Sequence, residues 1–336
     1  MAHRKLRRIC QVGGAVLCLA VVADCGSSSE PPANASGASG SHGTLTVFGA
    51  GTLANPFGQE IQAFRRQHPG VTVRSQFGAS GDMVKRITQL GQPADVLGVA
   101  DYSLIPRLMF GGSKPRATWY VGFVSNQITF AYTSHSKGAS ALTAANWYRV
   151  LARPGVRIGR SNPAADPSGY QLLQMLQLAQ RYYHDPALSA SVLRNSPAAS
   201  VAETETSLLA ALQSGQIDYL AIYRSDARQN HLRYIALPAQ INLSDPALAA
   251  RYKTVTVHTG LGALTAKPII YGLTVPSTAP DPALARQFIR FVLSAQGQAI
   301  MRGNGFAVIS PALASSKAAV PAALRPLTMP WPTPGG

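Results

Sequence analysis

The chain alternates short apolar runs with amphipathic stretches, a pattern typical of strands followed by helices. In the first part, apolar and β-branched runs bounded by Gly, Pro or small polar residues predict strands at 44–49, 71–77 and 94–100. Apolar residues at helical spacing separate these runs, from Phe57 to His68 and from Met83 to Leu90. The order strand, helix, strand, helix, strand predicts a parallel sheet with right-handed crossovers.

A second set of strands and helices follows residue 132. Helices are expected at 144–151, 167–183 and 206–213, and strands at 156–159 and 217–223. Extended segments near 124–132 and 232–238 suit a two-strand hinge, and a helix at 282–293 returns the chain to the first lobe. The predicted fold class is therefore α/β, with two lobes that each hold a central sheet flanked by helices, and no internal repeat.

The length of 336 residues also favours two lobes over one, and the 46% hydrophobic content is enough to fill their cores. We expect lobe 1 to comprise 44–130 and 239–325, and lobe 2 to comprise 131–238. The Pro- and Gly-rich segment 326–336 is expected to be a disordered tail. No apolar stretch of roughly 18 residues follows residue 25, so no internal membrane span is expected.

The N-terminus has the features of an export signal. Residues 3–8 are basic, and the apolar run from Ile9 to Ala23 is too short to span a membrane, which predicts a signal peptide at 1–24. The run ends in Val-Ala-Asp-Cys25, which resembles a bacterial lipoprotein cleavage motif with Cys25 as the lipidated residue. Because Asp24 stands where that motif has a small residue, an exported protein cleaved slightly later is the alternative.

The segment 25–43 is rich in Gly, Ser and Pro and predicts a flexible tether between the lipid anchor and the folded body. The three cysteines, Cys10, Cys18 and Cys25, all lie before this body, which excludes disulfides, thiol catalysis and Cys-ligated zinc from it. The protein is therefore expected at the cell membrane as a lipoprotein, or in the periplasm.

The net charge is +16, from 30 Lys and Arg against 14 Asp and Glu. The basic residues are scattered and form no five-residue block in the body, so attraction to an anionic solute or lipid is favoured over nucleic-acid binding. The seven histidines lack metal-ligand spacing, and no nucleophile elbow, phosphate-binding loop or catalytic carboxylate pair is present. We therefore expect a binding protein rather than an enzyme.

Two Gly-flanked turns of lobe 1 carry hydroxyl groups. Thr52 follows the first strand and Ser80 follows the second, each at the expected start of a helix. Hydroxyls and free amides at helix N-termini suit an oxyanion, and ligands of open α/β sheets bind beyond the carboxyl ends of the strands. The alternative is that each hydroxyl only caps its helix.

Lobe 2 carries three further candidates. Asp166 precedes Pro167, a combination that starts helices, and Glu205 lies at the start of the helix expected at 206–213. Tyr223 ends the strand expected at 217–223. Each of these residues has a structural explanation beside a functional one.

Several stretches together resemble the archaeal-type tungstate/molybdate-binding proteins of ABC importers, and the resemblance covers about residues 44 to 310. They are Val47–Leu53, Ala94–Met109, Asn146–Tyr148, Asp166–Tyr170, Gly215–Tyr219, Ile222–Ser225 and Leu237–Asp245. The resemblance implies a type II periplasmic-binding fold that closes on one oxyanion between its lobes.

The family's binding residues fall on five positions of this chain. The resemblance implies that Thr52 and Ser80 hold oxo groups, that Asp166 and Glu205 bind the metal of the oxyanion, and that Tyr223 donates a hydrogen bond. It also implies a membrane permease as partner, a monomer, and no cofactor besides the bound tungstate or molybdate.

The chain departs from the family pattern near this site. Thr52 replaces the usual Ser, Ser168 the usual Cys and Gln171 the usual Arg, while Thr204 stands where the family has Lys before its Glu. The stretch 195–205 is also shorter than in the family.

The two carboxylates discriminate among anions. A carboxylate beside a dianion is repulsive, more so in a dry cleft, so a sulfate site should use neutral donors. Tungsten(VI) and molybdenum(VI) are large, hard centres that accept extra oxygen ligands, which in the family gives six-oxygen coordination. Hydrogen phosphate can donate its own proton to one carboxylate. One acid therefore suits phosphate, and two suit tungstate or molybdate.

Two other interpretations remain open. One is an exported binding protein for phosphate or sulfate. The other, from a different class, is a basic exported adhesin or nucleic-acid binder, which would show steep salt dependence through many Lys and Arg contacts.

Overall fold

The computed structural model describes residues 42–331. The expected signal peptide at 1–24, the lipidation site Cys25, the tether up to residue 41 and the last five residues lie outside the described part. No helix within 42–331 is long and apolar enough to cross a membrane.

Lobe 1 is built on a seven-stranded mixed sheet with the order β14-β13-β4-β12-β3-β1-β2. Its strands are β1 (Gly43–Ala50), β2 (Val71–Gly78), β3 (Val96–Val99), β4 (Val121–Ser125), β12 (Ile270–Thr274), β13 (Ala307–Ala314) and β14 (Thr328–Pro330). As predicted, β1, β2 and β3 pair in parallel, because a helix connects each to the next. The pairs that β4 makes with β12 and β13 are antiparallel.

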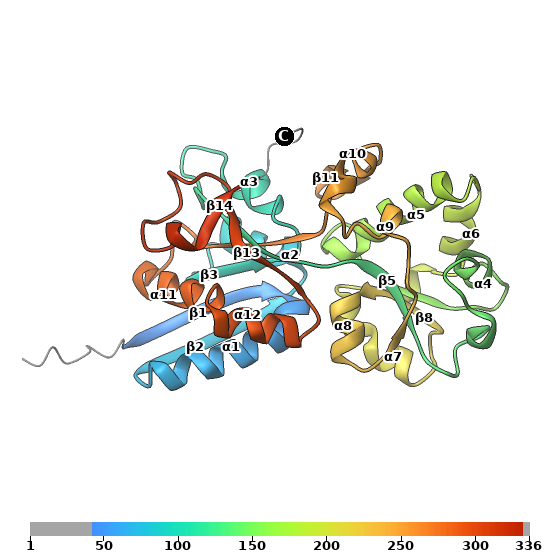
Figure 1. Cartoon of the computed structure of the whole chain (residues 1–336), viewed down its shortest axis with the longest axis horizontal. Helices are drawn as coiled ribbons and strands as arrows, with labels where there is room; N and C mark the ends of the chain where they lie inside the picture. The colour runs from blue at the N-terminus through green and yellow to red at the C-terminus, as the bar shows by residue number, and fades with distance from the viewer. Residues whose placement is uncertain (1–41, 332–336) are drawn as a thin grey trace, which may run out of the picture. The chain divides into compact units, whose positions relative to one another are not determined.

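Lobe 2 is built on a five-stranded sheet with the order β7-β6-β8-β5-β9. Its strands are β5 (Ile128–Tyr132), β6 (Ile158–Ser161), β7 (Val201–Ala202), β8 (Tyr219–Tyr223) and β9 (Arg233–Tyr234). A separate antiparallel pair, β10 (Thr256–Thr259) with β11 (Gly262–Thr265), follows later in the chain. Figure 1 shows β5 running away from the lobe 1 strands into this second sheet.

Helices flank both sheets (Figure 1). They are α1 (Ala54–Gln67), α2 (Ser80–Thr88), α3 (Leu104–Met109), α4 (Trp147–Leu151), α5 (Pro167–Tyr182), α6 (Leu188–Arg194), α7 (Leu209–Gln213), α8 (Arg224–Gln229), α9 (Ala239–Asn242), α10 (Ala249–Tyr252), α11 (Pro282–Val292) and α12 (Ala295–Gly303). Short 3₁₀ segments include η1 (Gly51–Leu53) and η4 (Glu205–Leu208). In lobe 1, the ring of Phe288 from α11 packs edge-to-face on Phe57 and Phe64 of α1, at centroid distances of 6.0 and 5.4 Å.

The order of elements follows the sequence prediction, but three boundaries differ. The chain leaves the first sheet at residues 126–127, so β5 belongs to lobe 2 although lobe 1 was expected to reach residue 130. Residues 328–330 form β14 on β13, whereas a disordered tail was expected from residue 326. The edge of β13 supplies backbone partners that the composition of this segment does not reveal.

The third difference concerns the segment around β11, which was placed in lobe 1 alone. Gln174 of α5 in lobe 2 donates to the carbonyl of Leu264, while Arg107 of α3 in lobe 1 donates to the carbonyls of Leu261 and Ala263. The segment therefore contacts both lobes.

Glu60 lies on the buried face of α1. It is fully buried, and neither carboxylate oxygen has a hydrogen-bond partner within residues 42–331. Burial raises the pKa of Glu60 well above its usual value of about 4.5. The folded protein therefore holds Glu60 protonated where the unfolded chain would release the proton, so this residue lowers stability as the pH rises above 4.5.

Replacing Glu60 by Met should stabilise the protein, because Met fills a similar volume without a polar group to desolvate. We expect a gain of about 1–3 kcal/mol in the free energy of unfolding at pH 8, and a smaller gain at pH 4.5. Urea denaturation at both pH values measures this. Gln62, on the exposed face of the same helix, gives the matched control, Gln62→Met, which should change stability little at either pH. An equal gain for Glu60→Met at both pH values would contradict the account.

Candidate functional site

All five candidate residues are buried, with exposed fractions of 4% for Thr52, 0% for Ser80, 4% for Asp166, 1% for Glu205 and 1% for Tyr223. Thr52 lies in η1 directly after β1, and Ser80 begins α2 after β2. Asp166 precedes α5, Glu205 begins η4, and Tyr223 ends β8. The candidates thus sit at element ends in both lobes, where the chain turns away from a sheet.

The two lobes touch at these turns. The amide of Gly81, next to Ser80, donates to the carbonyl of Ala165, next to Asp166, at 2.9 Å. A methyl group added at Gly51, next to Thr52, would lie 3.1 Å from Oγ1 of Thr206, next to Glu205. Both hydroxyl turns of lobe 1 therefore face the carboxyl groups of lobe 2, and the structure has the closed arrangement.

Ser168 joins the two carboxyl groups. Its Oγ lies 2.6 Å from Oδ2 of Asp166, 2.7 Å from Oε2 of Glu205 and 2.5 Å from Oγ of Ser161. A hydroxyl has one proton, so Ser168 can donate to only one of the two carboxyl groups at a time. The other carboxyl completes its contact by donating a proton of its own, so this arrangement holds one proton on the carboxyl pair.

Among residues 42–331, no cationic side chain pairs with either carboxyl group, that of Asp166 or that of Glu205. Burial raises the pKa of both groups, and the proximity of Asp166 raises that of Glu205 further. Oε1 of Glu205 is buried with no hydrogen-bond partner in the described chain. A buried carboxylate oxygen without a protein partner can accept a hydrogen bond from a ligand or bind a metal.

These carboxyl groups do not make a metal site by themselves. No group of three or more His, Cys, Asp or Glu side chains in the described range could hold a metal ion. Two carboxylate oxygens suit a hard metal centre whose remaining ligands arrive with it, as oxo groups do.

The capping alternative for the lobe 1 hydroxyls is wrong. The residues that precede α1 and α2 as caps are Leu53 and Ala79, so neither Thr52 nor Ser80 is an N-cap. Oγ of Ser80 accepts from the amide of Ala100 at 3.1 Å, which leaves the Ser80 proton free of any partner among residues 42–331. The expectation of free amides in this turn fails at Gly81, whose amide is taken by lobe 2.

The lobe 2 candidates also differ from simple caps. Asp166 is the N-cap of α5 with Pro167 as first residue, as predicted, but its carboxyl bonds to the Ser168 hydroxyl and makes no capping bond to the helix backbone. Thr204, not Glu205, caps η4. The hydroxyl of Tyr223 donates to Oε1 of Gln171 at 2.7 Å, so in this arrangement its proton is committed to a neighbouring side chain.

A second buried carboxylate cluster ties the lobes together. The hydroxyl of Tyr170, from α5, donates to Oδ2 of Asp101, after β3, at 2.8 Å, and Nζ of Lys267 lies 2.9 Å from the same oxygen. Burial alone would raise the pKa of Asp101, but Lys267 and Tyr170 together bring it below its usual value. This compensated carboxylate holds the lobes together without being available to a ligand.

Sequence reasoning missed several residues of the site, namely Ser161, Tyr271 and Asn126. They lie on strands or crossing segments whose local pattern is that of ordinary core. Only the pairing of distant strands brings them to the candidate residues, so no local signal marks them.

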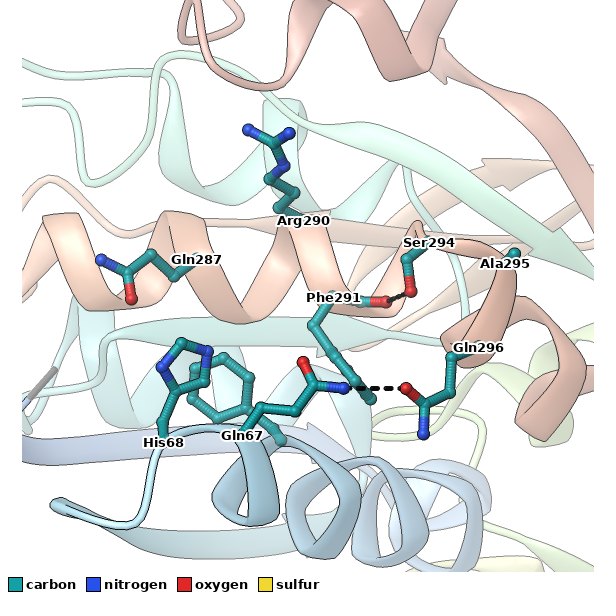
Figure 2. A pocket seen from close by; sticks show the side chains of 9 residues that line it. Gln67, His68, Gln287, Arg290, Phe291, Ser294, Ala295 and Gln296 are labelled. Atoms are coloured by element: carbon teal, nitrogen blue, oxygen red, sulfur yellow. Dashed lines mark hydrogen bonds between the residues drawn. The ribbon is translucent and has the colours of Figure 1, made fainter. Parts of the chain in front are cut away.

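A separate surface pocket of about 510 Å³ lies between the end of α1 and the corner of α11 and α12. Figure 2 shows that its lining includes Gln67, His68 and Gln296. It contains none of the five candidate residues and no carboxylate, so it is not the oxyanion site.

A protein family described as bacterial extracellular solute-binding protein matches residues 45–307. The molybdate/tungstate-binding protein WtpA of Pyrococcus abyssi is 37% identical over 299 residues, covering 80% of this chain and 86% of that protein. The chain belongs to the bacterial extracellular solute-binding protein family.

Solved structures of the same fold bind different anions. The periplasmic molybdate-binding protein of Azotobacter vinelandii superposes with a TM-score of 0.57 at 18% identity, covering 79% of this chain and 99% of that one. The sulfate-binding protein SubI of Mycobacterium tuberculosis also gives 0.57, at 17% identity, covering 84% and 89%. These likenesses confirm the two-lobed periplasmic-binding fold of this family member but do not select its ligand.

Replacing Gly81 by Ala should hold the lobes apart, because the added carbon would lie 2.6 Å from the carbonyl oxygen of Ala165 in the other lobe. Small-angle scattering should show a larger radius of gyration, and affinity for any interlobe ligand should fall by about tenfold or more. Gly58 of α1 has open space around it, so Gly58→Ala is the matched control. It should leave closure unchanged and raise stability by about 0.5–1 kcal/mol. A Gly81→Ala protein with the same radius of gyration as the parent would contradict this account of the contact between Gly81 and Ala165.

Proposed function

We propose that this protein is the extracytoplasmic solute-binding component of an ABC importer and captures tungstate or molybdate between its lobes. The observation that carries the proposal is the buried pair Asp166 and Glu205, joined by Ser168 and left without a cation. Its similarity to the Pyrococcus protein named for molybdate and tungstate supports the same ligand class.

The chemistry of the pair favours a metal oxyanion over sulfate. Even with one shared proton, the pair keeps a negative charge that would repel a sulfate dianion in a buried site, and sulfur accepts no further oxygen ligands. Tungsten(VI) and molybdenum(VI) accept them, and the bond to the metal offsets the repulsion between carboxylates and oxo groups. Oε1 of Glu205, which has no partner in the described chain, is available for such a bond.

The other candidates complete the proposed site. Ser80 supplies a hydroxyl donor to an oxo group from lobe 1, and Thr52 acts there through the neighbouring side chain to which its hydroxyl donates. Tyr223 adds a donor when its hydroxyl breaks the hydrogen bond to Gln171 and donates to the ligand instead. Because donors come from one lobe and metal ligands from the other, the full set exists only when the lobes are closed, so the ligand stabilises the closed form.

The role is binding rather than catalysis, and delivery of the ligand needs a membrane permease that recognises the closed form. The basic N-terminal segment and the motif at Cys25 support export and lipid anchoring, with the folded part acting as a monomer on its tether. Mass spectrometry of the protein from membranes tests acylation of Cys25.

Calorimetric titration with tungstate, molybdate, sulfate and phosphate tests the ligand. We expect tungstate and molybdate to bind more tightly than sulfate. Tighter binding of sulfate would overturn the proposal, and preferred binding of phosphate would point to the phosphate alternative.

Removing either metal ligand should affect tungstate selectively. Asp166→Asn and Glu205→Gln should each weaken tungstate binding by about a hundredfold or more, because each removes a charged oxygen ligand. Neither change should weaken residual sulfate binding, since the repulsion falls. Asp185→Asn, which lies beyond the opposite end of α5 from Asp166, is the control and should bind as the parent does. Equal losses for tungstate and sulfate would contradict direct binding to the metal.

A further inference from the structure

Tyr271 of β12 stands next to the proposed site. It is fully buried, and its ring packs on Tyr223 at a centroid distance of 5.9 Å. The Thr52 hydroxyl donates to the Tyr271 hydroxyl at 3.0 Å. Tyr271 therefore connects the hydroxyl turn of lobe 1 with the tyrosine of lobe 2.

Asn126 fixes this hydroxyl from the other side. It lies at the point where the chain passes from β4 to β5, and Nδ2 donates to Tyr271 at 3.3 Å and to Oγ of Ser225 at 2.7 Å. Its Oδ1 accepts from the amides of Gln127 and Ser225. With both N–H groups and the carbonyl engaged, the amide can present only a donor to Tyr271.

Counting protons shows that one donor is left over. Thr52 and Tyr271 together bring two hydroxyl protons, and the bond between them uses one. Asn126 adds a further donor and takes no proton away. Within residues 42–331, neither hydroxyl donates to any carbonyl or carboxylate. Since Thr52 is the donor in their mutual bond, the unused proton belongs to Tyr271.

We propose that Tyr271 is a further oxyanion-binding residue of the proposed site between the lobes, with its O–H donating to an oxygen of the bound anion, and that Asn126 is the positioning residue that directs it. A buried donor without an acceptor costs free energy, and an anion between the lobes supplies the acceptor. Burial, followed by the nearby charge of Asp226, keeps the pKa of Tyr271 well above 10, so the phenol carries its proton at neutral pH.

The inference about Tyr271 rests on the proposed function in one respect, namely that an oxyanion binds between the lobes. The hydrogen bond between Thr52 and Tyr271 also predicts how their effects on binding combine. Because the Thr52 hydroxyl donates to Tyr271, Thr52 affects the anion through Tyr271, and the two hydroxyls act as one unit. Removing either should therefore have effects that do not simply multiply.

The test compares Tyr271→Phe, Thr52→Val and the double variant with the parent, each titrated with tungstate, molybdate, sulfate and phosphate. Tyr271→Phe should weaken binding of the preferred anion by about tenfold or more. Thr52→Val should weaken it less, and the double variant should match Tyr271→Phe within about twofold. Tyr219→Phe, which removes another buried hydroxyl, bonded to the carbonyl of Lys137, is the control and should bind as the parent does.

Two outcomes overturn the proposal. One is a Tyr271→Phe protein that is folded by circular dichroism and binds within twofold of the parent. The other is a double variant whose loss is the product of the two single losses, which would mean two independent contacts.

A pH profile tests the positioning role of Asn126. Asn126→Asp places a carboxylate where an N–H donated, so the Tyr271 proton should turn toward Asp and away from the anion. The affinity of this variant relative to the parent should be low at pH 9 and recover toward pH 6, because a protonated Asp is again a donor. A loss that does not change with pH would overturn this role.

The anion panel separates this inference from the proposed function. If the parent prefers sulfate or phosphate, the tungstate assignment fails while Tyr271 is still tested with the anion that binds. A parent that binds none of the four anions overturns both.

Discussion

The proposed site depends on two neighbouring carboxyl groups of lobe 2, to which the described part of the chain supplies no cation. Asp166 and Glu205 are both buried, and Ser168 is within hydrogen-bonding distance of each. Two ionised carboxylates at this distance repel each other strongly where water is excluded, so the closed arrangement needs either a shared proton or a positive centre. A ligand that brings a high-valent metal supplies that centre, which makes closure depend on what is bound.

Another carboxylate at the interlobe contact, that of Asp101, does have compensating partners. Asp101 is as deeply buried, but Lys267 and Tyr170 both bond to it. This group is compensated by protein side chains and holds the lobes together. The contrast shows that the described residues compensate one carboxylate at the interlobe contact and leave the pair Asp166 and Glu205 without such a partner.

Small residues allow the lobes to approach this closely. A side-chain carbon at Gly81 would overlap the backbone of lobe 2, and one at Gly51 would press on Thr206. Around the contact, Asn126 hydrogen-bonds to both lobes from the crossing segment, to Tyr271 on one side and to Ser225 on the other. The turn at Thr52 is thereby connected, through Tyr271 and Asn126, with the segment that links the two lobes.

The sequence by itself determined the order of strands and helices, because apolar periodicity and Gly or Pro at the turns are local signals. It also indicated the five candidate residues through motifs at element ends, and the structure buries all five. It did not reveal that Ser168 joins the carboxyl groups, that Gln171 takes the Tyr223 hydroxyl, or that Tyr271 adjoins Thr52. Tyr271 is 219 positions from Thr52, and such a contact arises only when β12 is placed in the sheet between β3 and β4. Which protons are shared and which donors remain unused depends on distances of a few tenths of an ångström, and only the tertiary structure sets these.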